Sequence, residues 1–427
     1  MNHMKIAPLQ KSIVQPVVSR IMEILKLSYP TRVVPLNGDE INDAFDKLDK
    51  CNDVYTDDDG DTVTVGLSSN PSSFSTVQSA EEYFETHEYS FVPSKFKMVS
   101  LLGSGNFGKV YLGEYAHEGA NRETRQYAIK CLSKSRVNDA EMTQILEEKA
   151  ILKMMENPFV LRLYGTYQTD DALCFVTEVI DCGDLFSVIH GGERLPHEAC
   201  RFYAACIVMG LDYIHSKKIT FRDLKPENIM INSRGYPKII DFGLAKQVPY
   251  IAPDVDDGIP RLYSRCFTLC GTPEYVAPEI ILRNGYNHLA DVWAFGVLLY
   301  EIIARRTPFF DGDNKDGDYI TNLFTNIIIA SKNGIILSKR IDRITDGTSN
   351  ASDLITRLLS GDPKKRLTEA ATASILKAPY FSGVDADALY EQTIEAPFLH
   401  DQFEGRPLET ASADEPFIGD QELFVDF

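Results

Sequence analysis

Three polar segments at characteristic spacing are the feature that most constrains the fold of this chain. Residues 221–228 read Phe-Arg-Asp-Leu-Lys-Pro-Glu-Asn, and Asp241 opens an Asp-Phe-Gly triplet 18 residues after Asp223. An Ala-Pro-Glu triplet begins at Ala277, 36 residues after Asp241. Two carboxylates and the amide of Asn228 can therefore converge on one site. Such oxygen groups bind divalent cations, and a carboxylate can accept a proton.

This set of groups suits the transfer of a phosphoryl group. That reaction needs little covalent chemistry from a protein: metal ions must sit on the phosphates, a hydroxyl must be positioned and charge must be neutralised. The order of the motifs resembles that of the catalytic half of the protein kinases. The resemblance implies that Asp223 is the base and that Asp241 and Asn228 are magnesium ligands. Lys225, two residues after the base, is then expected to contact the transferred phosphate.

A glycine-rich motif precedes these segments. Gly103, Gly105 and Gly108 form a G-x-G-x-x-G pattern, which also fits the dinucleotide-binding fingerprint, with Glu123 at the expected 20 residues on. The flanks decide between the two, because a dinucleotide-binding turn opens a helix whereas residues 109–115 are rich in strand formers. We therefore expect a strand–loop–strand hairpin over phosphates, which glycine lets the backbone approach closely.

A lysine–glutamate pair is expected next to this hairpin. Lys130 ends a strand-like Tyr-Ala-Ile-Lys run 22 residues after Gly108 and is expected to bind the α- and β-phosphates. Glu148 lies 18 residues later, in residues 140–155, which are rich in helix formers. An ion pair between the two would hold that helix against the sheet. Glu147 is the alternative and faces about 100° away on the helix, but the Glu-Lys-x-Ile-Leu pattern, as in kinases, favours Glu148.

The net charge and the cysteines limit which partners the chain can bind and in which cellular compartment it is expected. The 427 residues carry a net charge of −19, which argues against nucleic acid or an anionic membrane as the main partner. No apolar run approaches a membrane span and the start Met-Asn is no myristoylation signal, so no stable membrane anchor is expected.

The eight cysteines show no paired metal spacing and indicate reduced thiols in a cytoplasmic protein, with the nucleus as a second location. Most of them are expected to be structural, and regulatory oxidation is an alternative for Cys266 and Cys270, which flank Thr268.

The expected fold class is α+β with two lobes, a small β-rich lobe and a large, mainly helical lobe. Helices are expected over residues 196–216, 289–304 and 352–359. The expected parts are an acidic, partly disordered N-terminal extension (1–90), a kinase domain (91–381) made of a small lobe (91–177), a hinge (178–183) and a large lobe (184–381), and a C-terminal tail (382–427).

Four further motifs carry a closer resemblance. They are Leu-Cys-Gly-Thr-Pro-Glu-Tyr at 269–275, the aromatic residue before Arg222, Ile-Glu-Ala-Pro-Phe at 394–398 and Phe-Val-Asp-Phe at 424–427. Together they resemble the cyclic-nucleotide-dependent branch of the AGC Ser/Thr protein kinases, closest to the cyclic-AMP-dependent kinases. The cyclic-GMP-dependent kinases come second, because residues 1–90 show no nucleotide-binding domain, and another AGC kinase comes third.

The resemblance implies a Ser/Thr kinase that uses ATP and Mg²⁺. It implies that Thr272 hydrogen-bonds near Asp223, that Thr268 is phosphorylated, and that Glu279 pairs with Arg366. It also implies that the hinge backbone holds adenine. The nucleotide-binding residues that it implies are Gly103, Gly105, Phe107, Gly108, Val110, Ala128, Lys130, Glu148, Thr177, Glu178 and Met230.

The resemblance also implies partners and a role for the tail. Protein or peptide substrates would carry arginine shortly before the phosphoacceptor, because carboxylates suit guanidinium groups. The residues that would line the peptide groove are Asp184, Glu227, Glu274 and Glu301. A regulatory subunit that binds a cyclic nucleotide is the other implied partner. Phe424 and Phe427, in a tail of AGC type, are expected to dock on the small lobe beside the helix that carries Glu148.

Several positions depart from the family pattern. An insertion occupies residues 247–265, and the tail lacks the family's Phe-Asp-Asp-Tyr element. Thr177 stands where methionine is usual, and Gln144 replaces a histidine that would contact the phosphate on the loop. A pseudokinase scaffold is the alternative class of function. A pseudokinase usually lacks the catalytic lysine, the base aspartate or the metal-binding aspartate. This chain keeps all three, as Lys130, Asp223 and Asp241.

Overall fold

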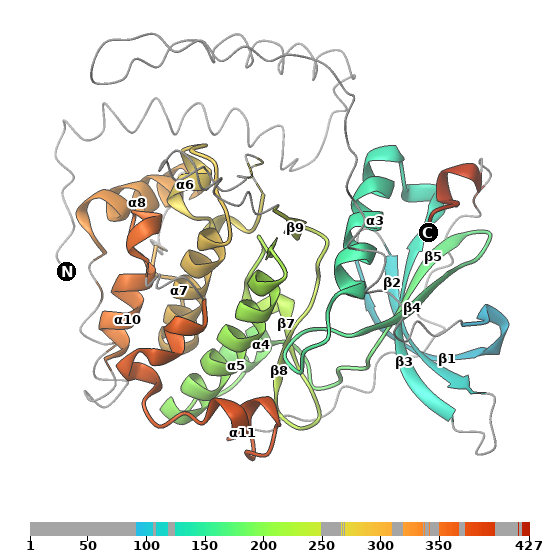
Figure 1. The fold of residues 1–427 in the computed structure, drawn as a ribbon, viewed down its shortest axis with the longest axis horizontal. Helices are drawn as coiled ribbons and strands as arrows, with labels where there is room; N and C mark the ends of the chain where they lie inside the picture. The colour runs from blue at the N-terminus through green and yellow to red at the C-terminus, as the bar shows by residue number, and fades with distance from the viewer. Residues whose placement is uncertain are drawn as a thin grey trace, which may run out of the picture. The chain divides into compact units, whose positions relative to one another are not determined.

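The structure is a computed structural model, in which all the described residues belong to one unit of the chain. It describes residues 91–105, 108–117, 124–248, 266, 268, 270–309, 319–335, 337, 341, 350–366, 372–397, 417 and 421–427. The expected N-terminal extension, Phe107 and most of the expected insertion lie outside these residues. Figure 1 shows strands β1 to β5 gathered in one part of this unit and most of the helices in another, as the predicted bilobal α+β fold requires.

The small lobe is built on an antiparallel sheet with the strand order β1-β2-β3-β5-β4. Its strands are β1 (Phe96–Ser104), β2 (Gly108–Ala116), β3 (Thr124–Ser133), β4 (Leu163–Gln168) and β5 (Ala172–Thr177). β1 and β2 form the hairpin predicted from the glycine motif, and since no helix follows the glycines, the dinucleotide-binding alternative is wrong. A Cβ on Gly108 would lie 2.0 Å from the carbonyl oxygen of Cys131, so β2 can pair with β3 here only through glycine.

One long helix packs against this sheet. α3 (Asp139–Lys153) begins in a capping box, in which the side chain of Asn138 accepts a hydrogen bond from the N–H of Glu141 and the Glu141 carboxylate accepts one from the N–H of Asn138. The observed bounds differ from the predicted ones by one residue at the start and two at the end. Glu148 is buried and Glu147 is exposed, so the face that carries Glu148 is the one turned to the sheet.

The large lobe is mainly helical, and its predicted helices are present to within one residue at each end. Its longer helices are α5 (His197–Ser216), α7 (Leu289–Ala304), α8 (Tyr319–Asn333) and α10 (Ala351–Leu358), and the shorter ones are α4 (Leu185–His190), α6 (Pro278–Ile281) and α11 (Ala386–Tyr390). α7 is apolar almost throughout, and its Trp293 is fully buried. None of the helices in the described ranges is long and apolar enough to cross a membrane.

Two short two-stranded sheets in the large lobe position the catalytic segments. β6 (Ile219–Thr220) pairs with β9 (Lys246–Gln247), and β7 (Ile229–Ile231) pairs with β8 (Pro237–Ile239). The segment that carries Asp223 connects β6 to β7, and the Asp-Phe-Gly segment connects β8 to β9. Because the connected strands are paired in this way, the two segments face each other.

The end of the chain packs on the small lobe. Phe424 is fully buried, and the ammonium of Lys134 lies 4.7 Å from the centre of its ring. The ring of Phe427 meets Phe175 of β5 edge-on at 5.3 Å, and Lys149 of α3 lies 5.0 Å from the Phe427 ring centre. The structure therefore places both phenylalanines against the small lobe and next to α3.

Candidate active site

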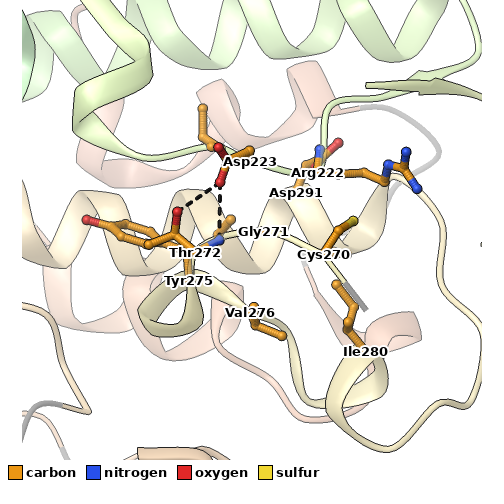
Figure 2. A pocket seen from close by; sticks show the side chains of 12 residues that line it. Arg222, Asp223, Cys270, Gly271, Thr272, Tyr275, Val276, Ile280 and Asp291 are labelled. Atoms are coloured by element: carbon orange, nitrogen blue, oxygen red, sulfur yellow. Dashed lines mark hydrogen bonds between the residues drawn. The ribbon is translucent and has the colours of Figure 1, made fainter. Parts of the chain in front are cut away.

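The carboxylate of Asp223 lies at the centre of a hydrogen-bond network. Thr272 donates to Asp223 Oδ1 twice, from its hydroxyl at 2.9 Å and from its backbone N–H at 3.1 Å. The amide of Asn228 donates to Asp223 Oδ2 at 2.9 Å, and Lys225 Nζ lies 2.8 Å from the same oxygen. Lys225 also donates to the Thr272 hydroxyl at 2.9 Å. Figure 2 shows Thr272 turned toward Asp223 across the pocket between their segments.

A second aspartate, Asp291 of α7, accepts hydrogen bonds from the backbone of the segment that carries Asp223. Asp291 is buried, and its two carboxylate oxygens accept hydrogen bonds from the backbone N–H groups of Phe221 and Arg222, both at 2.8 Å. His215 of α5 contacts Asp291 Oδ2 at 2.8 Å. These bonds support the left-handed conformation of Arg222, which has a φ of 72°. Asp291 was missed in the sequence, where its signal is a carboxylate inside an otherwise apolar helix.

Lys130 of β3 and Glu148 of α3 form the ion pair expected from the sequence. Lys130 Nζ lies 2.7 Å from Glu148 Oε1, and the Glu148 side chain is 7% exposed. Burial disfavours the ammonium, but the carboxylates of Glu148 and Asp241 outweigh this effect and raise the pKa of Lys130 above its usual value. Lys130 is therefore charged, and α3 is held against the sheet.

Asp241 leaves its carboxylate exposed next to this pair. Its φ of 60° turns the backbone sharply, and the N–H of Gly243 donates to Asp241 Oδ1 at 3.3 Å. Phe242 points the other way into the core, where its ring packs edge-on against Phe221 at 5.3 Å. The N–H of Ile240 donates to the carbonyl oxygen of Asn228 at 2.9 Å, which ties the two catalytic segments together.

The glycine hairpin and β3 leave room for a nucleotide. A Cβ built on Gly103 or Gly105 meets no atom within 4 Å, so the glycine backbone borders open space. Val110 lies directly opposite Lys130 in the β2–β3 pairing. Such a space beside a lysine and an exposed carboxylate fits a polyphosphate with its metal ion.

Three residues expected to bind the nucleotide, Thr177, Glu178 and Met230, lie in or next to strands of the two lobes. Thr177 is buried, and its hydroxyl lies 3.4 Å from the carbonyl oxygen of Ala128. The side chain of Glu178 accepts hydrogen bonds from Lys238 Nζ at 2.8 Å and from the N–H of Arg162 at 2.9 Å. The backbone N–H of Glu178 also donates to the carbonyl oxygen of Arg162 at 3.2 Å, so the backbone carbonyl is the group of Glu178 that can contact an adenine. Met230 of β7 is half-buried.

Of the four acidic residues expected in the peptide groove, two raise the pKa of a third through their negative charges. Glu227 is exposed as a residue, but partial desolvation of its carboxylate raises its pKa. The charges of Glu301 and Asp184 act in the same direction, and that of Lys225 acts in the opposite one. Asp184 caps α4 by accepting from the N–H of Ser187 at 2.7 Å. The four carboxylates therefore do not have equal access to a ligand.

The other two acidic residues are bonded within the protein. Glu301 is buried in α7, where it contacts His190 Nε2 at 2.9 Å and accepts a hydrogen bond from the Tyr275 hydroxyl. Glu274 is half-buried and accepts a hydrogen bond from the Tyr319 hydroxyl at 2.7 Å. Glu301 is thus the least able of the four to contact a ligand directly.

The hydroxyl of Thr268 meets the arginine that precedes the base. Arg222 Nη1 donates to Thr268 Oγ1 at 3.0 Å, and the hydroxyl of Tyr286 donates to the Thr268 carbonyl at 2.9 Å. Arg222 Nε also donates to the carbonyl of Leu244, just beyond the Asp-Phe-Gly segment. One guanidinium therefore connects Thr268 to both catalytic segments.

A buried ion pair supports the large lobe, as expected from the sequence. Arg366 Nη1 and Nη2 donate to the two carboxylate oxygens of Glu279 at 2.6 and 2.7 Å, and Nη1 also donates to the carbonyl of Leu289 at 3.0 Å. Arg366 is fully buried and stacks near Trp293 at 5.1 Å. Because both side chains are buried and bonded to each other, we interpret this pair as structural.

Comparison with known proteins identifies the family. The family model of the protein kinase domain matches residues 96–381, well over half of the chain. The chain is 33% identical to a cAMP-dependent protein kinase catalytic subunit of Arthrobotrys oligospora over 329 residues, which are 76% of this chain and 57% of that protein. It is 35% identical to a cAMP-dependent protein kinase catalytic subunit of Dictyostelium discoideum over 308 residues, or 71% of this chain and 42% of that protein.

A third relative is Serine/threonine-protein kinase N2 of Danio rerio. It is 31% identical over an alignment of 431 residues, which covers 95% of this chain and 40% of that protein. The chain thus spans about half the length of these curated relatives. ATP and Mg²⁺ are the phosphate donor and cofactor of the family. The chain belongs to the protein kinase family and, within it, to the AGC group of Ser/Thr kinases.

Proposed function

We propose that this chain is a Mg²⁺- and ATP-dependent Ser/Thr protein kinase that phosphorylates peptides with arginine shortly before the phosphoacceptor. The observation that carries the proposal is the arrangement around Asp223. Its carboxylate is held by Thr272, Lys225 and Asn228 at 2.8 to 3.1 Å, which fixes a base in one orientation.

The residues around the glycine hairpin fit ATP with its metal ion. When bound, Mg²⁺–ATP supplies the phosphoryl group, and the metal offsets negative charge on the phosphates. Lys130 binds the α- and β-phosphates, and Glu148 keeps Lys130 in place. Asp241 and the side-chain oxygen of Asn228 hold the metal. The nitrogen of the Asn228 amide is already committed to Asp223, which leaves that oxygen available.

Asp223 orients the hydroxyl of the substrate and accepts its proton late in the transfer. Lys225 contacts the transferred phosphate and offsets its charge, because its ammonium lies 2.8 Å from the base. Thr272 prevents the base from rotating through its two hydrogen bonds. Each of these groups is positioned before substrate binds, which lowers the cost of reorganisation during the reaction.

The acidic residues expected in the groove support the proposed preference for arginine. Glu227 is exposed and lies in the field of Glu301 and Asp184, so a guanidinium bound there relieves repulsion between carboxylates. We assign direct contact with the substrate arginine to Glu227. Asp184, Glu274 and Glu301 contribute negative charge while holding α4, Tyr319 and Tyr275 in place.

We further propose that the chain is cytoplasmic and that a separate cyclic-nucleotide-binding subunit regulates it. Support comes from the cyclic-AMP-dependent relatives. Capture of partners on the full chain, with and without cyclic AMP, tests this regulation. A protein that is retained without the nucleotide and released by it supports the proposal. Retention that cyclic AMP, cyclic GMP and buffer affect equally contradicts it.

The kinase activity is tested with a pair of peptides that differ only in the residues before the serine, arginine in one and alanine in the other. We expect the arginine peptide to have a kcat/KM at least about tenfold higher, as a charged hydrogen bond is worth about 1.5–3 kcal/mol. Glu227→Gln should reduce that ratio, and Glu147→Gln, an exposed carboxylate on α3, serves as the control. No phosphate transfer to either peptide, or an equal kcat/KM for both, contradicts the proposal.

A further inference from the structure

Four side chains form a row across the face of the small-lobe sheet that is turned away from Lys130. In the strand pairing, Lys109 of β2 lies opposite Cys131 of β3, Cys131 opposite Cys174 of β5, and Cys174 opposite Tyr167 of β4. Directly paired residues of an antiparallel sheet point to the same face, and the next residue along a strand points to the other. Lys130 therefore faces the nucleotide, and Cys131 faces away from it.

The two thiols in this row are close enough to react with each other. Cys174 Sγ donates a hydrogen bond to Cys131 Sγ at 3.2 Å, and neither cysteine is in a disulfide. Opposite residues of an antiparallel pair have Cα atoms about 4.5–5.5 Å apart, which lies within the range of disulfides. Bond formation thus requires a small rotation of the side chains and no rearrangement of the strands.

The two thiols differ in access, which gives each a distinct role. Cys131 is half-buried and in reach of a small oxidant, whereas Cys174 is 2% exposed and sits in an apolar cluster with Tyr127 and Val176. Cys131 is the sulfur that attacks, and Cys174 is the one that resolves.

We propose that Cys131 and Cys174 are a redox-active pair, which a hydroperoxide oxidises to a reversible disulfide across β3 and β5. The Cys131 thiolate attacks the terminal peroxide oxygen, the O–O bond breaks, and a sulfenic acid and water (or an alcohol) result. The Cys174 sulfur then attacks the sulfenic sulfur, the S–S bond forms and the S–O bond breaks, and water leaves. Two thiols are oxidised by two electrons in total, and the hydroperoxide takes up both.

The disulfide would join strands that carry the nucleotide site on their other face. It closes a loop between cysteines that are 43 residues apart, and this loop includes α3 with Glu148. Cross-linking restricts the unfolded chain more than the folded one, so the oxidised small lobe should resist heating. Lys130 keeps its orientation, because the new bond forms on the opposite face.

The test uses the full chain and stoichiometric hydrogen peroxide, followed by alkylation and peptide mapping under non-reducing conditions. We expect a peptide pair linked through Cys131 and Cys174, its loss on treatment with dithiothreitol, and a melting temperature several degrees higher in the oxidised protein. Cys131→Ser should abolish both the link and the shift. Cys174→Ser should leave a sulfenic acid on Cys131, which a sulfenic-acid probe labels.

The matched control is the double variant Cys266→Ser with Cys270→Ser, which removes the thiols around Thr268. It should form the linked peptide as the parent does. Two outcomes overturn the proposal: both thiols remain open to alkylation after denaturation of the treated parent, or Cys131 becomes a sulfinic acid while Cys174 stays a thiol. Peptide mapping of the parent decides the matter even if the Cys174 variant fails to fold. Because these measurements detect sulfur chemistry and melting, they do not depend on kinase activity.

Discussion

The side-chain amide of Gln144 on α3 donates a hydrogen bond to the carbonyl oxygen of Gly243 in the Asp-Phe-Gly segment. Gln144 stands where the family resemblance leads one to expect a histidine directed at a phosphate. In this chain the side chain of Gln144 is instead hydrogen-bonded to the segment that carries Asp241. Since α3 also carries Glu148, the helix connects the lysine and the metal-binding segment directly.

Loss of this connection should lower activity moderately. Gln144→Leu removes the donor, and one hydrogen bond is worth about 0.5–1.5 kcal/mol. We expect kcat to fall about fivefold with little change in melting temperature. Glu147→Gln on the exposed side of α3 is the control. An unchanged kcat in Gln144→Leu would show that the contact does not position the Asp-Phe-Gly segment.

Replacement of the phosphate- and metal-binding residues should nearly abolish turnover. Lys130→Met removes the charge expected on the α- and β-phosphates, and Asp241→Ala removes the main metal ligand. Electrostatic groups at such sites contribute several kcal/mol, so each change should reduce kcat at least ~100-fold. Lys97→Met, which alters an exposed ammonium paired with Glu114, should leave kcat unchanged. Turnover within tenfold of the parent in either site variant contradicts these assignments.

Phosphorylation of Thr268 should raise activity through Arg222. A phosphothreonine adds a charge of about −1.5 to −2 and three acceptor oxygens, and the guanidinium of Arg222 already lies 3.0 Å from the Thr268 hydroxyl. We expect Thr268→Ala to reduce kcat/KM about tenfold or more, measured on protein whose phosphorylation has been mapped. Thr356→Ala on the exposed side of α10 is the control. Full activity of the Thr268 variant would count against the switch.

The C-terminal phenylalanines should stabilise the small lobe and support activity together. Burial of a phenylalanine ring contributes about 1.5–3 kcal/mol, and Phe424 is fully buried. Phe424→Ala, or deletion of residues 423–427, should lower both the melting temperature and kcat. Val425→Ala is the matched control, because Val425 lies between the two phenylalanines in the sequence and is 74% exposed. If the deletion changes neither quantity, the tail has another role, such as binding a partner.

Removal of Arg366 should destabilise the large lobe strongly. Arg366→Ala leaves the Glu279 carboxylate buried without its partner, which costs about 3–5 kcal/mol. Urea unfolding measures this loss. The double variant Arg366→Met with Glu279→Gln should regain part of the stability, since it leaves no uncompensated charge. A midpoint for Arg366→Ala close to that of the parent contradicts a stabilising ion pair.

The elements that the sequence predicts well are those with a strong local pattern. α7 is apolar except for a few positions such as Asp291 and Glu301, and the predicted bounds 289–304 are the observed ones. The hairpin around Gly103 follows from glycines flanked by strand formers. The pairing of Lys130 with Glu148 rather than Glu147 was predicted from the Glu-Lys-x-Ile-Leu pattern shared with kinases, and the structure confirms it.

The parts that sequence could not predict depend on contacts between distant segments. Asp291 holds the backbone of Phe221 from 70 residues away, and no local pattern reveals that bond. The four acidic residues of the groove look alike in sequence, yet Glu301 is buried while Glu227 is exposed. Burial and partners, which only the fold defines, separate a carboxylate that can bind a ligand from one that holds the scaffold.

Thr177 gives this kinase a feature that a chemist could use. Its side chain is short and buried against the carbonyl of Ala128, at the inner end of the proposed adenine site. A methionine there would extend into the volume behind the adenine, whereas threonine ends after its methyl and hydroxyl groups. Inhibitors with an additional aromatic ring directed past the adenine position should therefore favour this enzyme over AGC kinases with a bulkier side chain at that position. Thr177→Met would supply the resistant form needed to show that such a compound acts on its intended target.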